Sequence, residues 1–505
     1  MKAVGYGRLV EKFSLDVLEL QVRSFIHEKS LRRSVENGAM REFYYPVSYD
    51  PGDAWQDNLV FALKYEGVQL EVLAALFVVI GPNEVRDFIA AAHLGKYSRQ
   101  TWFLYEFLMN ERLDLPDLDR GNYIPILDEA QVLSCLDRTQ ALRVKRQRIL
   151  NNLPGPREYC PIIRRTKVLD SFDLIAVKER IAKRLGSYPA RIVERAARYL
   201  YSKETKSSFE IEQENPNERR VNRFIELLRQ AGGDDPYSEA DLVRLEQAIV
   251  EERYASSGFR KTQNYVGESL GPTREWVHYV PPKPADLSSL MEGWTVSCRR
   301  LRVSETKILA LATIAGFGFV FLHPFEDGNG RLHRFLIHDA LVACGFTPRS
   351  LIFPVSAVML RRLKDYDAAL EAYSKPLMEH LTYTLSDRGE LSVQGDTQPL
   401  YRYPDLTAQA EALAGFIEET VDTELAAELE YLALFDAARE RVRSLLDMPD
   451  KRLDLFVSLC IQGKGRLSHA KRSRFPELRD EELATLEQVV AAEMERPPLS
   501  NSILN

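Results

Sequence analysis

The most informative absences in this chain of 505 residues concern cysteine pairs and charge. Five cysteines stand singly along the sequence, and none belongs to a Cys-x-x-Cys pair, which argues against a zinc site and fits reduced thiols. The formal net charge is only −7, so the overall composition gives no sign of a nucleic-acid or membrane-surface partner. The composition is that of a globular protein long enough for two or three domains.

Two kinds of segment are also missing. The sequence has no Gly-x-x-x-x-Gly-Lys-Ser/Thr motif, so a P-loop is excluded as its phosphate site. The most apolar stretch, residues 308–322, is shorter than the about 20 residues that span a bilayer, and the first residues contain no apolar signal segment. We therefore expect a cytoplasmic protein without a membrane segment, in which residues 308–322 form a buried core helix.

The chemistry of the chain is concentrated in His323-Pro-Phe-Glu-Asp-Gly-Asn-Gly-Arg331 and in Arg334. The Gly-Asn-Gly turn, residues 328–330, can take positive-φ conformations that point successive backbone N–H groups into an anion nest. The residues that follow, 331–341, have the apolar spacing of a helix. A nest that opens a helix predicts a phosphate site, because free N–H groups and the helix dipole both favour negative charge.

The side chains around this nest supply the rest of a transfer reaction. Arg331 and Arg334 are three residues apart on the expected helix, so they can hold one polyphosphate together. Asp327 offers a hard oxygen ligand for Mg²⁺, which takes its other ligands from phosphates and water. His323 precedes the nest, where an imidazole could accept a proton from an attacking hydroxyl. The residues therefore predict phosphoryl or nucleotidyl transfer.

At every defining position this stretch resembles His-Pro-Phe-x-Asp-Gly-Asn-Gly-Arg-x-x-Arg, the signature of Fic-domain proteins. The resemblance implies a mainly α structure, with a Fic-fold helical core and a β-hairpin flap. It also implies an enzyme that transfers AMP from Mg-ATP to a Ser, Thr or Tyr hydroxyl of a target protein and of itself. It implies that His323 is the catalytic base and that Phe325 anchors the loop in the core. Asp327 would bind the metal, and the nucleotide contacts would include Asp327, Gly328, Asn329, Gly330, Arg331 and Arg334.

A second motif lies upstream, in Ser207-Ser-Phe-Glu-Ile-Glu-Gln213. Ser208 and Glu212 are one helical turn apart, which is also the pattern of a capped helix. Beside the signature, the stretch is similar to the Ser/Thr-x-x-x-Glu-Gly/Asn inhibitory segment of Fic proteins, with Gln213 in place of Gly or Asn. The resemblance implies that Glu212 pairs with Arg334 and keeps it from the γ-phosphate of ATP.

A third motif spans residues 258–280, where two β-prone runs surround a Gly-Pro turn and predict a hairpin. The stretch resembles the Fic flap, which would present the target segment by strand addition. The resemblance places four flap residues at the border of the nucleotide: Asn264, Tyr265, Val266 and Gly267. It also places Tyr366 beside the adenine.

The chain is expected to contain a helical N-terminal region at about 1–190, the Fic core at about 191–390 and a helical C-terminal domain at about 400–505. Continuous helices are expected at 59–79, 241–254 and 408–446, and a linker at 386–404. A basic stretch includes Arg146 and Arg164, but a solvated helix face explains it better than a nucleic-acid surface. A homodimer remains open.

Several alternatives to AMP transfer also remain open. The same fold could remove AMP, with Glu212 orienting a water, or transfer another phosphoryl or nucleotidyl group. Gly330 argues against the kinase-like branch, which has Lys at that position. A regulatory protein that only senses ATP would not need the base His323.

Overall fold

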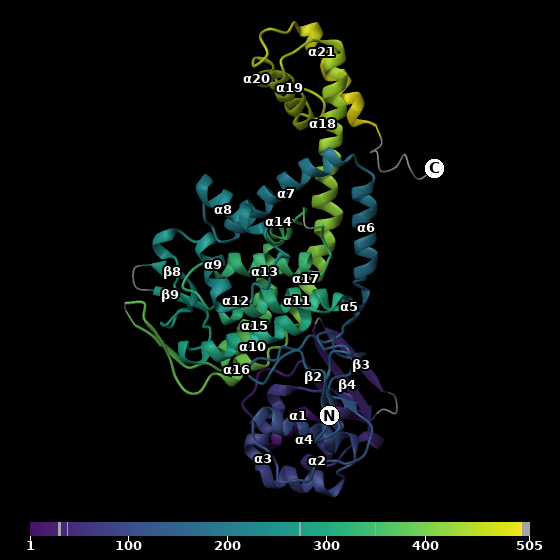
Figure 1. Cartoon of the computed structure of the whole chain (residues 1–505), viewed down its shortest axis with the longest axis vertical. Helices are drawn as coiled ribbons and strands as arrows, with labels where there is room; N and C mark the ends of the chain where they lie inside the picture. Colours follow the sequence, from purple (N-terminus) through teal and green to yellow (C-terminus); the bar gives the residue numbers. More distant parts are fainter. Residues whose placement is uncertain (29–31, 38, 272–273, 349, 387, 497–505) are drawn as a thin grey trace. The chain divides into compact units, whose positions relative to one another are not determined.

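The computed structural model describes residues 1–28, 32–37, 39–271, 274–348, 350–386 and 388–496. It is mainly helical, as the sequence predicts (Figure 1). The chain forms two compact units, the first made of residues 1–172, 208–346 and 359–415 and the second of 173–207, 347–358 and the residues from 416 onward. The three-part division expected from the sequence stays a prediction.

The N-terminal part of the first unit contains two small sheets beside its helices. A four-stranded sheet has the order β1-β2-β4-β3, in which β2 and β4 are parallel and the other pairs antiparallel. Its strands are β1 (Lys2–Val4), β2 (Val22–His27), β3 (Arg33–Asn37) and β4 (Met40–Pro46). Buried and partly exposed residues alternate along β2, the period of a half-buried strand.

Helices α1 (Tyr6–Phe13), α2 (Trp55–Tyr65), α3 (Leu70–Ala91) and α4 (Lys96–Met109) complete this part of the unit. The helix expected at 59–79 is wrong as one element, because α2 ends at Tyr65 and α3 starts at Leu70. The carboxylate of Glu66 turns away to the start of α1, where it accepts a hydrogen bond from the Tyr6 N–H at 2.8 Å. The left-handed Gly67, with φ 86°, ends α2, and its N–H donates to the Ala62 carbonyl at 3.0 Å.

The second small sheet, of order β5-β7-β6, contains the basic stretch. Its strands are β5 (Ile124–Pro125), β6 (Leu142–Val144) and β7 (Ile149–Asn151). Arg146 pairs with Glu106 at 3.1 Å and lies over the Trp102 ring, while Arg164 pairs with Asp405 at 2.6 Å. These two arginines are therefore mostly buried and have carboxylate partners, so they belong neither to a solvated helix face nor to a nucleic-acid surface.

The apolar stretch 308–322 lies at the centre of the Fic-like core, as expected. It consists of α11 (Ile308–Thr313), a π-helical turn (Ile314–Gly318) and α12 (Phe319–Leu322), and nearly all of its side chains are buried. Helix α10 (Pro284–Arg302) packs against α11 and the π-helical turn, and α13 (Asn329–Ala343) packs against α11 (Figure 1). The other helices of this region are α5 (Lys167–Ser171), α8 (Glu218–Leu228), α9 (Glu239–Ile249) and α15 (Leu363–Glu379).

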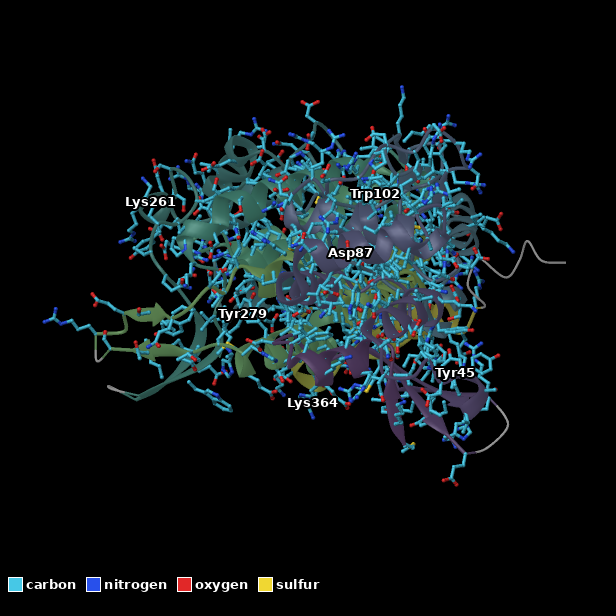
Figure 2. All side chains as sticks on the ribbon, turned by 90° about the horizontal axis from the view of Figure 1, so that it is seen from below. Tyr45, Asp87, Trp102, Lys261, Tyr279 and Lys364 are labelled. Atoms are coloured by element: carbon cyan, nitrogen blue, oxygen red, sulfur yellow. The ribbon has the colours of Figure 1, made fainter. Side chains whose placement is uncertain are left out.

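The expected hairpin at 258–280 is present as β8 (Val266–Gly271) and β9 (Arg274–Tyr279), which are antiparallel. The central residues of its turn, 272 and 273, lie outside the described residues. The helix expected at 241–254 is shorter than predicted, because α9 ends at Ile249 and a 3₁₀ turn follows at Glu252–Tyr254. The chain between Tyr254 and Val266 contains no regular element. Tyr279, labelled in Figure 2, is buried at the end of β9 and donates to the Phe321 carbonyl at 2.6 Å.

The linker expected at 386–404 is wrong in part. The hairpin β10 (Tyr383–Leu385) and β11 (Leu391–Val393) enters it, and α16 (Pro399–Arg402) follows. Tyr401 is buried and donates to the Val280 carbonyl at 2.7 Å, which fastens this segment to the core.

The second unit is helical. It includes α6 (Leu174–Gly186), the larger part of α7 (Ala190–Ile211), the start of α14 (Val355–Arg361) and the elements from the end of α17 (Thr407–Glu419) onward. The helix expected at 408–446 is present as α17, a π-helical turn (Thr420–Leu425) and α18 (Ala426–Leu445). Helices α19 (Asp450–Gln462), α20 (His469–Arg472) and α21 (Asp480–Met494) follow, and α18, α19 and α21 share one apolar core.

All five cysteines are buried free thiols. In the part of the chain that the structure describes, no helix is both long and apolar enough to cross a membrane.

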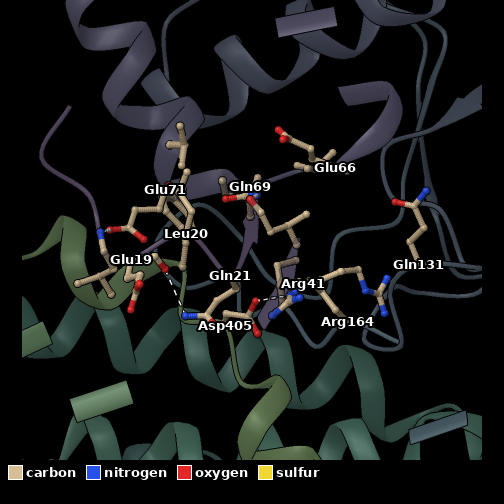
Figure 3. A pocket seen from close by; sticks show the side chains of 18 of the residues that line it. Glu19, Leu20, Gln21, Arg41, Glu66, Gln69, Glu71, Gln131, Arg164 and Asp405 are labelled. Carbon is tan, nitrogen blue, oxygen red and sulfur yellow. Dashed lines mark hydrogen bonds and ion pairs between the residues drawn. The ribbon is translucent and has the colours of Figure 1, made fainter. Parts of the chain in front are cut away.

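The first unit encloses a cavity of about 220 Å³, lined by its N-terminal elements, α15 and residues 403–405 (Figure 3). The ion pair of Arg164 and Asp405 forms part of its wall. Burial raises the pKa of Glu66, another wall residue, to about 7.

Candidate active site

His323 lies at the C-terminal end of α12 in a left-handed conformation, with φ 49° and ψ 58°. Its Nδ1 is 3.1 Å from the Val320 carbonyl oxygen. Because a carbonyl can only accept, this contact requires the proton of the neutral ring to be on Nδ1. The lone pair of Nε2 is then available, which is the form that a general base needs.

The electrostatic environment keeps this ring neutral. Burial lowers the pKa of His323 to about 4, although the nearby carboxylates of Glu212 and Asp327 act in the opposite direction. The His323 ring is thus unprotonated at neutral pH, and the charges of Glu212 and Asp327 both act on it.

The loop after His323 is fixed by buried groups. Phe325 is fully buried against Phe259 and Phe319, which confirms its expected packing role. The Asn329 side chain donates to the Phe325 carbonyl at 2.8 Å and accepts from the Phe325 N–H at 3.0 Å. The Asn329 amide thus closes the loop in this structure, and its contact with a phosphate stays a prediction.

The start of α13 has the geometry expected of an anion nest. Gly328 caps the helix with φ 85°, a conformation that side chains with a β-carbon rarely adopt. The helix then begins at Asn329 and runs to Ala343, two residues longer at each end than the predicted 331–341, and its apolar face is buried as expected. The free N–H groups of this first turn are those that would bind an anion.

The base of the flap holds the same loop from the other side. The Arg260 N–H donates to the Pro324 carbonyl at 2.8 Å, and its guanidinium Nε donates to the His323 carbonyl at 2.9 Å. Asn264 donates to the Phe325 carbonyl at 3.1 Å. The two flap residues Arg260 and Asn264 therefore position the backbone around His323. Among the other expected flap contacts, Tyr265 is partly exposed, and Val266 and Gly267 are exposed at the start of β8.

Arg334 is almost completely buried and is bound by the upstream segment. Its Nε donates to the Ser208 hydroxyl at 2.8 Å, and its Nη2 donates to the Ser208 carbonyl at 2.8 Å and to Glu212 Oε1 at 2.7 Å. The structure therefore brings together the three residues Ser208, Glu212 and Arg334 that the sequence pattern paired.

The Glu212 carboxylate also lies on the nest itself. A β-carbon added to Gly330 would be 2.1 Å from Glu212 Oε1, so the absence of a side chain at Gly330 is what lets the carboxylate approach. An anionic group thus rests against the first turn of α13, where free N–H groups and the helix dipole favour negative charge. Glu212 Oε1 therefore lies beside Gly330, near the N–H groups at which the sequence predicts a phosphate.

Arg331 is bound in a similar way by a residue that sequence reasoning missed. Its Nη2 is 2.9 Å from Glu214 Oε1 and 2.7 Å from Asp327 Oδ1. No sequence pattern singled out Glu214, because its position depends on the turn between it and Glu212. That turn is made by Gln213, which has φ 56°.

The end of α7 explains this turn. The Glu214 N–H donates to the Phe209 carbonyl at 3.0 Å and the Gln213 N–H to the Glu210 carbonyl at 2.9 Å, the pair of bonds that ends a helix through a left-handed residue. Gly or Asn takes this conformation easily, and Gln213 takes it with strain.

Tyr366 on α15 is buried, near Arg334 and against the His333 ring at 6.1 Å between ring centroids. Burial raises the pKa of this phenol to about 12 and lowers that of His333 to about 3, so both side chains are neutral at pH 7. His333 and His338, on the same helix as Arg334, are both buried.

The residues fit a magnesium–phosphate ligand at one position. Asp327 is half exposed and can turn an oxygen outward, and the carboxylate of Glu212 lies beside Gly330 in the first turn of α13. Among the described residues, no group of three or more His, Cys, Asp or Glu side chains could hold a metal ion without such a partner. Mg²⁺, which binds mainly phosphate and water oxygens, suits a site with a single carboxylate.

Residues 236–341, which include the flap and the complete signature, match the family model described as Fic/DOC family. The chain carries a Fic domain. Ser208, Glu212 and Glu214 lie outside the matched residues, on the N-terminal side of the Fic domain.

Curated relatives named "Protein adenylyltransferase Fic" match about a fifth of the chain. The protein of Culex quinquefasciatus is 37% identical over 93 residues, or 18% of this chain and 16% of the relative. That of Aedes aegypti is 38% identical over 93 residues, with the same coverage. The chain therefore spans about a sixth of the length of these relatives.

Solved structures resemble the chain more weakly. A Fic family protein from Desulfovibrio desulfuricans G20 has a TM-score of 0.38 and 18% identity, covering 62% of this chain and 87% of that one. A Fic domain containing signaling protein from Bacteroides thetaiotaomicron VPI-5482 has a TM-score of 0.31 and 16% identity, covering 51% of this chain and 94% of that one.

Proposed function

We propose that this protein is an adenylyltransferase that moves AMP from Mg-ATP to a Ser, Thr or Tyr hydroxyl of a target protein and of itself. The observation that carries the proposal is the start of α13, where a carboxylate lies beside Gly330, two buried arginines follow, and the charge of that carboxylate acts on a neutral imidazole. The names of the curated relatives support the same activity.

In the proposed step, Nε2 of His323 takes the proton of the target hydroxyl. The hydroxyl oxygen forms a bond to the α-phosphorus, the bond from that phosphorus to the bridging oxygen breaks, and pyrophosphate leaves. Arg331 would hold the β-phosphate and Arg334 the γ-phosphate, while the N–H groups of residues 328–330 would bind phosphate oxygens. Asp327 would hold the Mg²⁺, which neutralises phosphate charge when bound.

The flap and Tyr366 would complete the site. The strands β8 and β9 would present the target segment by strand addition, which fixes the position of its hydroxyl through main-chain bonds. Residues 264–267 would border the nucleotide, and Tyr366 would lie on its adenine side.

The structure described here would be an inhibited state. Glu212 engages Arg334 at 2.7 Å and occupies the nest at Gly330, so the γ-phosphate would compete with a carboxylate for both groups. ATP would then bind weakly, or with its α-phosphate misaligned for in-line attack.

Mass spectrometry tests the activity. The full chain is incubated with Mg-ATP, and the Glu212→Gly variant is expected to gain the mass of AMP on a Ser, Thr or Tyr side chain, while the double variant Glu212→Gly/His323→Ala gains none. A phosphate adduct in place of AMP, or equal labelling with and without His323, would contradict the proposal.

Removal of AMP is a second candidate, favoured by one observation. Glu212 Oε1 lies beside Gly330 in the motif that carries His323, and its charge acts to raise the pKa of His323, so Glu212 would be placed to orient a water near the base. Incubating AMP-modified protein with Mg²⁺ and no ATP would reveal it, since free AMP would then appear with wild type but not with Glu212→Gly.

A further inference from the structure

A second carboxylate of the upstream segment contacts the first arginine of the signature. Glu214 Oε1 is 2.9 Å from Arg331 Nη2, and Glu214 Oε2 accepts from Arg331 Nη1 at 3.3 Å. One hydrogen bond and one ion-pair contact thus join the guanidinium to the carboxylate, and a hydrogen bond between two charged groups is stronger than one between neutral groups. Glu214 Oε2 also accepts from Arg220 Nη2 at 2.8 Å, which fixes the carboxylate from the α8 side.

The surroundings of Arg331 leave this guanidinium little freedom. Its side chain is only 2% exposed, its Nη2 also contacts Asp327, and its guanidinium lies over the Phe209 ring at 5.3 Å from the centroid. Phe209 is fully buried on α7, and the guanidinium of Arg220 lies over the same ring at 5.1 Å. The segment that carries Glu214 therefore contacts Arg331 through both a carboxylate and an aromatic ring.

We propose that Glu214 is a second inhibitory residue, which closes Arg331 to the β-phosphate as Glu212 closes Arg334 to the γ-phosphate. The proposal rests on the proposed function, since it uses the two phosphate positions assigned there. It goes beyond the inhibitory pattern of the sequence, which contains Ser208 and Glu212 but not Glu214.

The turn at Gln213 is what makes a double contact possible. Residues 212 and 214 flank one left-handed residue, which changes the direction of the chain between them. Their carboxylates therefore reach two arginines that are one helical turn apart on α13. A pair of carboxylates on a pair of guanidiniums matches the charges that two adjacent phosphates would bring. Release of one carboxylate leaves the other arginine occupied.

This arrangement predicts that removing each glutamate changes the affinity for a different set of nucleotides. AMP reaches neither arginine through a β- or γ-phosphate, ADP reaches Arg331 alone, and ATP reaches both. Loss of the Glu214 charge should therefore tighten the binding of both ADP and ATP, whereas loss of the Glu212 charge should tighten the binding of ATP more than that of ADP.

The test is isothermal titration calorimetry of the full chain with ATP, ADP and AMP at constant Mg²⁺. The proteins are wild type, Glu214→Gln, Glu212→Gly and the double variant. Because Glu214 is 29% exposed, its pair is partly screened, and we expect Glu214→Gln to lower the Kd for ADP and ATP about three- to tenfold without changing that for AMP. In the double variant the Kd for ATP should fall below that of either single variant.

The matched control is Glu210→Gln, which removes the same charge from an exposed position near the end of α7 that pairs with neither arginine. It should leave all three Kd values unchanged. Glu214→Asp keeps the charge but withdraws the oxygens by one methylene, so it should shift ADP and ATP in the same direction by less, and it serves as the second variant if Glu214→Gln does not fold.

Equal tightening of AMP, ADP and ATP by Glu214→Gln, or no change with any nucleotide, would overturn the proposal. Failure of the proposed function is separate, because the binding measurement requires no transfer. If no variant transfers AMP but the ADP and ATP pattern holds, the proposed function is wrong and Glu214 still closes Arg331. If Glu212→Gly transfers AMP while Glu214→Gln leaves ADP binding unchanged, only the role of Glu214 is wrong.

Discussion

The sharpest prediction concerns Glu212→Gly, which removes one of the three hydrogen bonds that Arg334 makes with the upstream segment. A hydrogen bond to a charged group contributes about 1.5–3 kcal/mol where both partners are buried. Arg334 is 1% exposed but the Glu212 side chain is 35% exposed, so solvent weakens the pair and the lower half of that range applies.

A second effect adds to the first. Glu212 Oε1 lies on Gly330, so the wild-type carboxylate also repels a phosphate and blocks its place on the nest. Together the two effects give about 1.5–3 kcal/mol, which corresponds to a roughly 10- to 100-fold higher initial rate of AMP incorporation at subsaturating ATP.

The assay is the initial rate of pyrophosphate release, measured together with the build-up of AMP on the protein. Glu210→Gly is the matched control, because it places the same residue on the same helix at an exposed site that does not contact Arg334. An unchanged rate in Glu212→Gly would refute the brake. Adducts that accumulate without faster pyrophosphate release would mean that Glu212 serves removal of AMP. A Glu212→Gly/Arg334→Ala variant as active as Glu212→Gly would show that the brake does not act through Arg334.

Three further predictions follow from the same site. His323→Ala should lower the transfer rate about 10²–10⁴-fold while the Kd for ATP stays nearly unchanged, and an equal loss of both would make His323 structural. Burial lowers the pKa of His323 from 6.5 to about 4, so between these pH values the unfolded chain binds more protons than the folded one. The free energy of unfolding, measured by urea titration, should therefore decrease as pH falls from 6.5 to 4, and it should decrease less steeply in His323→Asn. The same pH dependence in both proteins would refute this. Gln213→Gly should raise the free energy of unfolding by up to about 1 kcal/mol, because glycine adopts the left-handed conformation without strain. It should also lower the basal transfer rate, because Glu212 and Glu214 would be held more firmly on their arginines. A faster basal rate would contradict this reasoning.

The parts of the fold that could be predicted are those that depend on local sequence. The helix at 308–322, the helix after the nest and the hairpin at 258–280 each follow from apolar period or turn chemistry within a few residues. The signature is contiguous, so the positions of His323 and Arg334 also follow from local structure.

The missed features depend on contacts between distant segments. The parallel pairing of β2 with β4 and the burial of Tyr401 each require a partner that local periodicity does not contain. Glu214 was missed for a related reason. Its contact with Arg331 depends on the backbone of Gln213, and glutamine is not a residue that predicts a left-handed turn.

The left-handed backbone at His323 and at Gln213 has a consequence for how this protein changes over generations. Both residues would fold more stably as glycine, and an asparagine would also be tolerated. Glycine at the first position removes the base, and glycine at the second should hold Glu212 and Glu214 more firmly on their arginines. Selection for heat resistance that acted through Gln213 would therefore favour a less active protein, whereas the left-handed residues Ser14, Arg148 and Lys464 offer the same relief of strain away from this site.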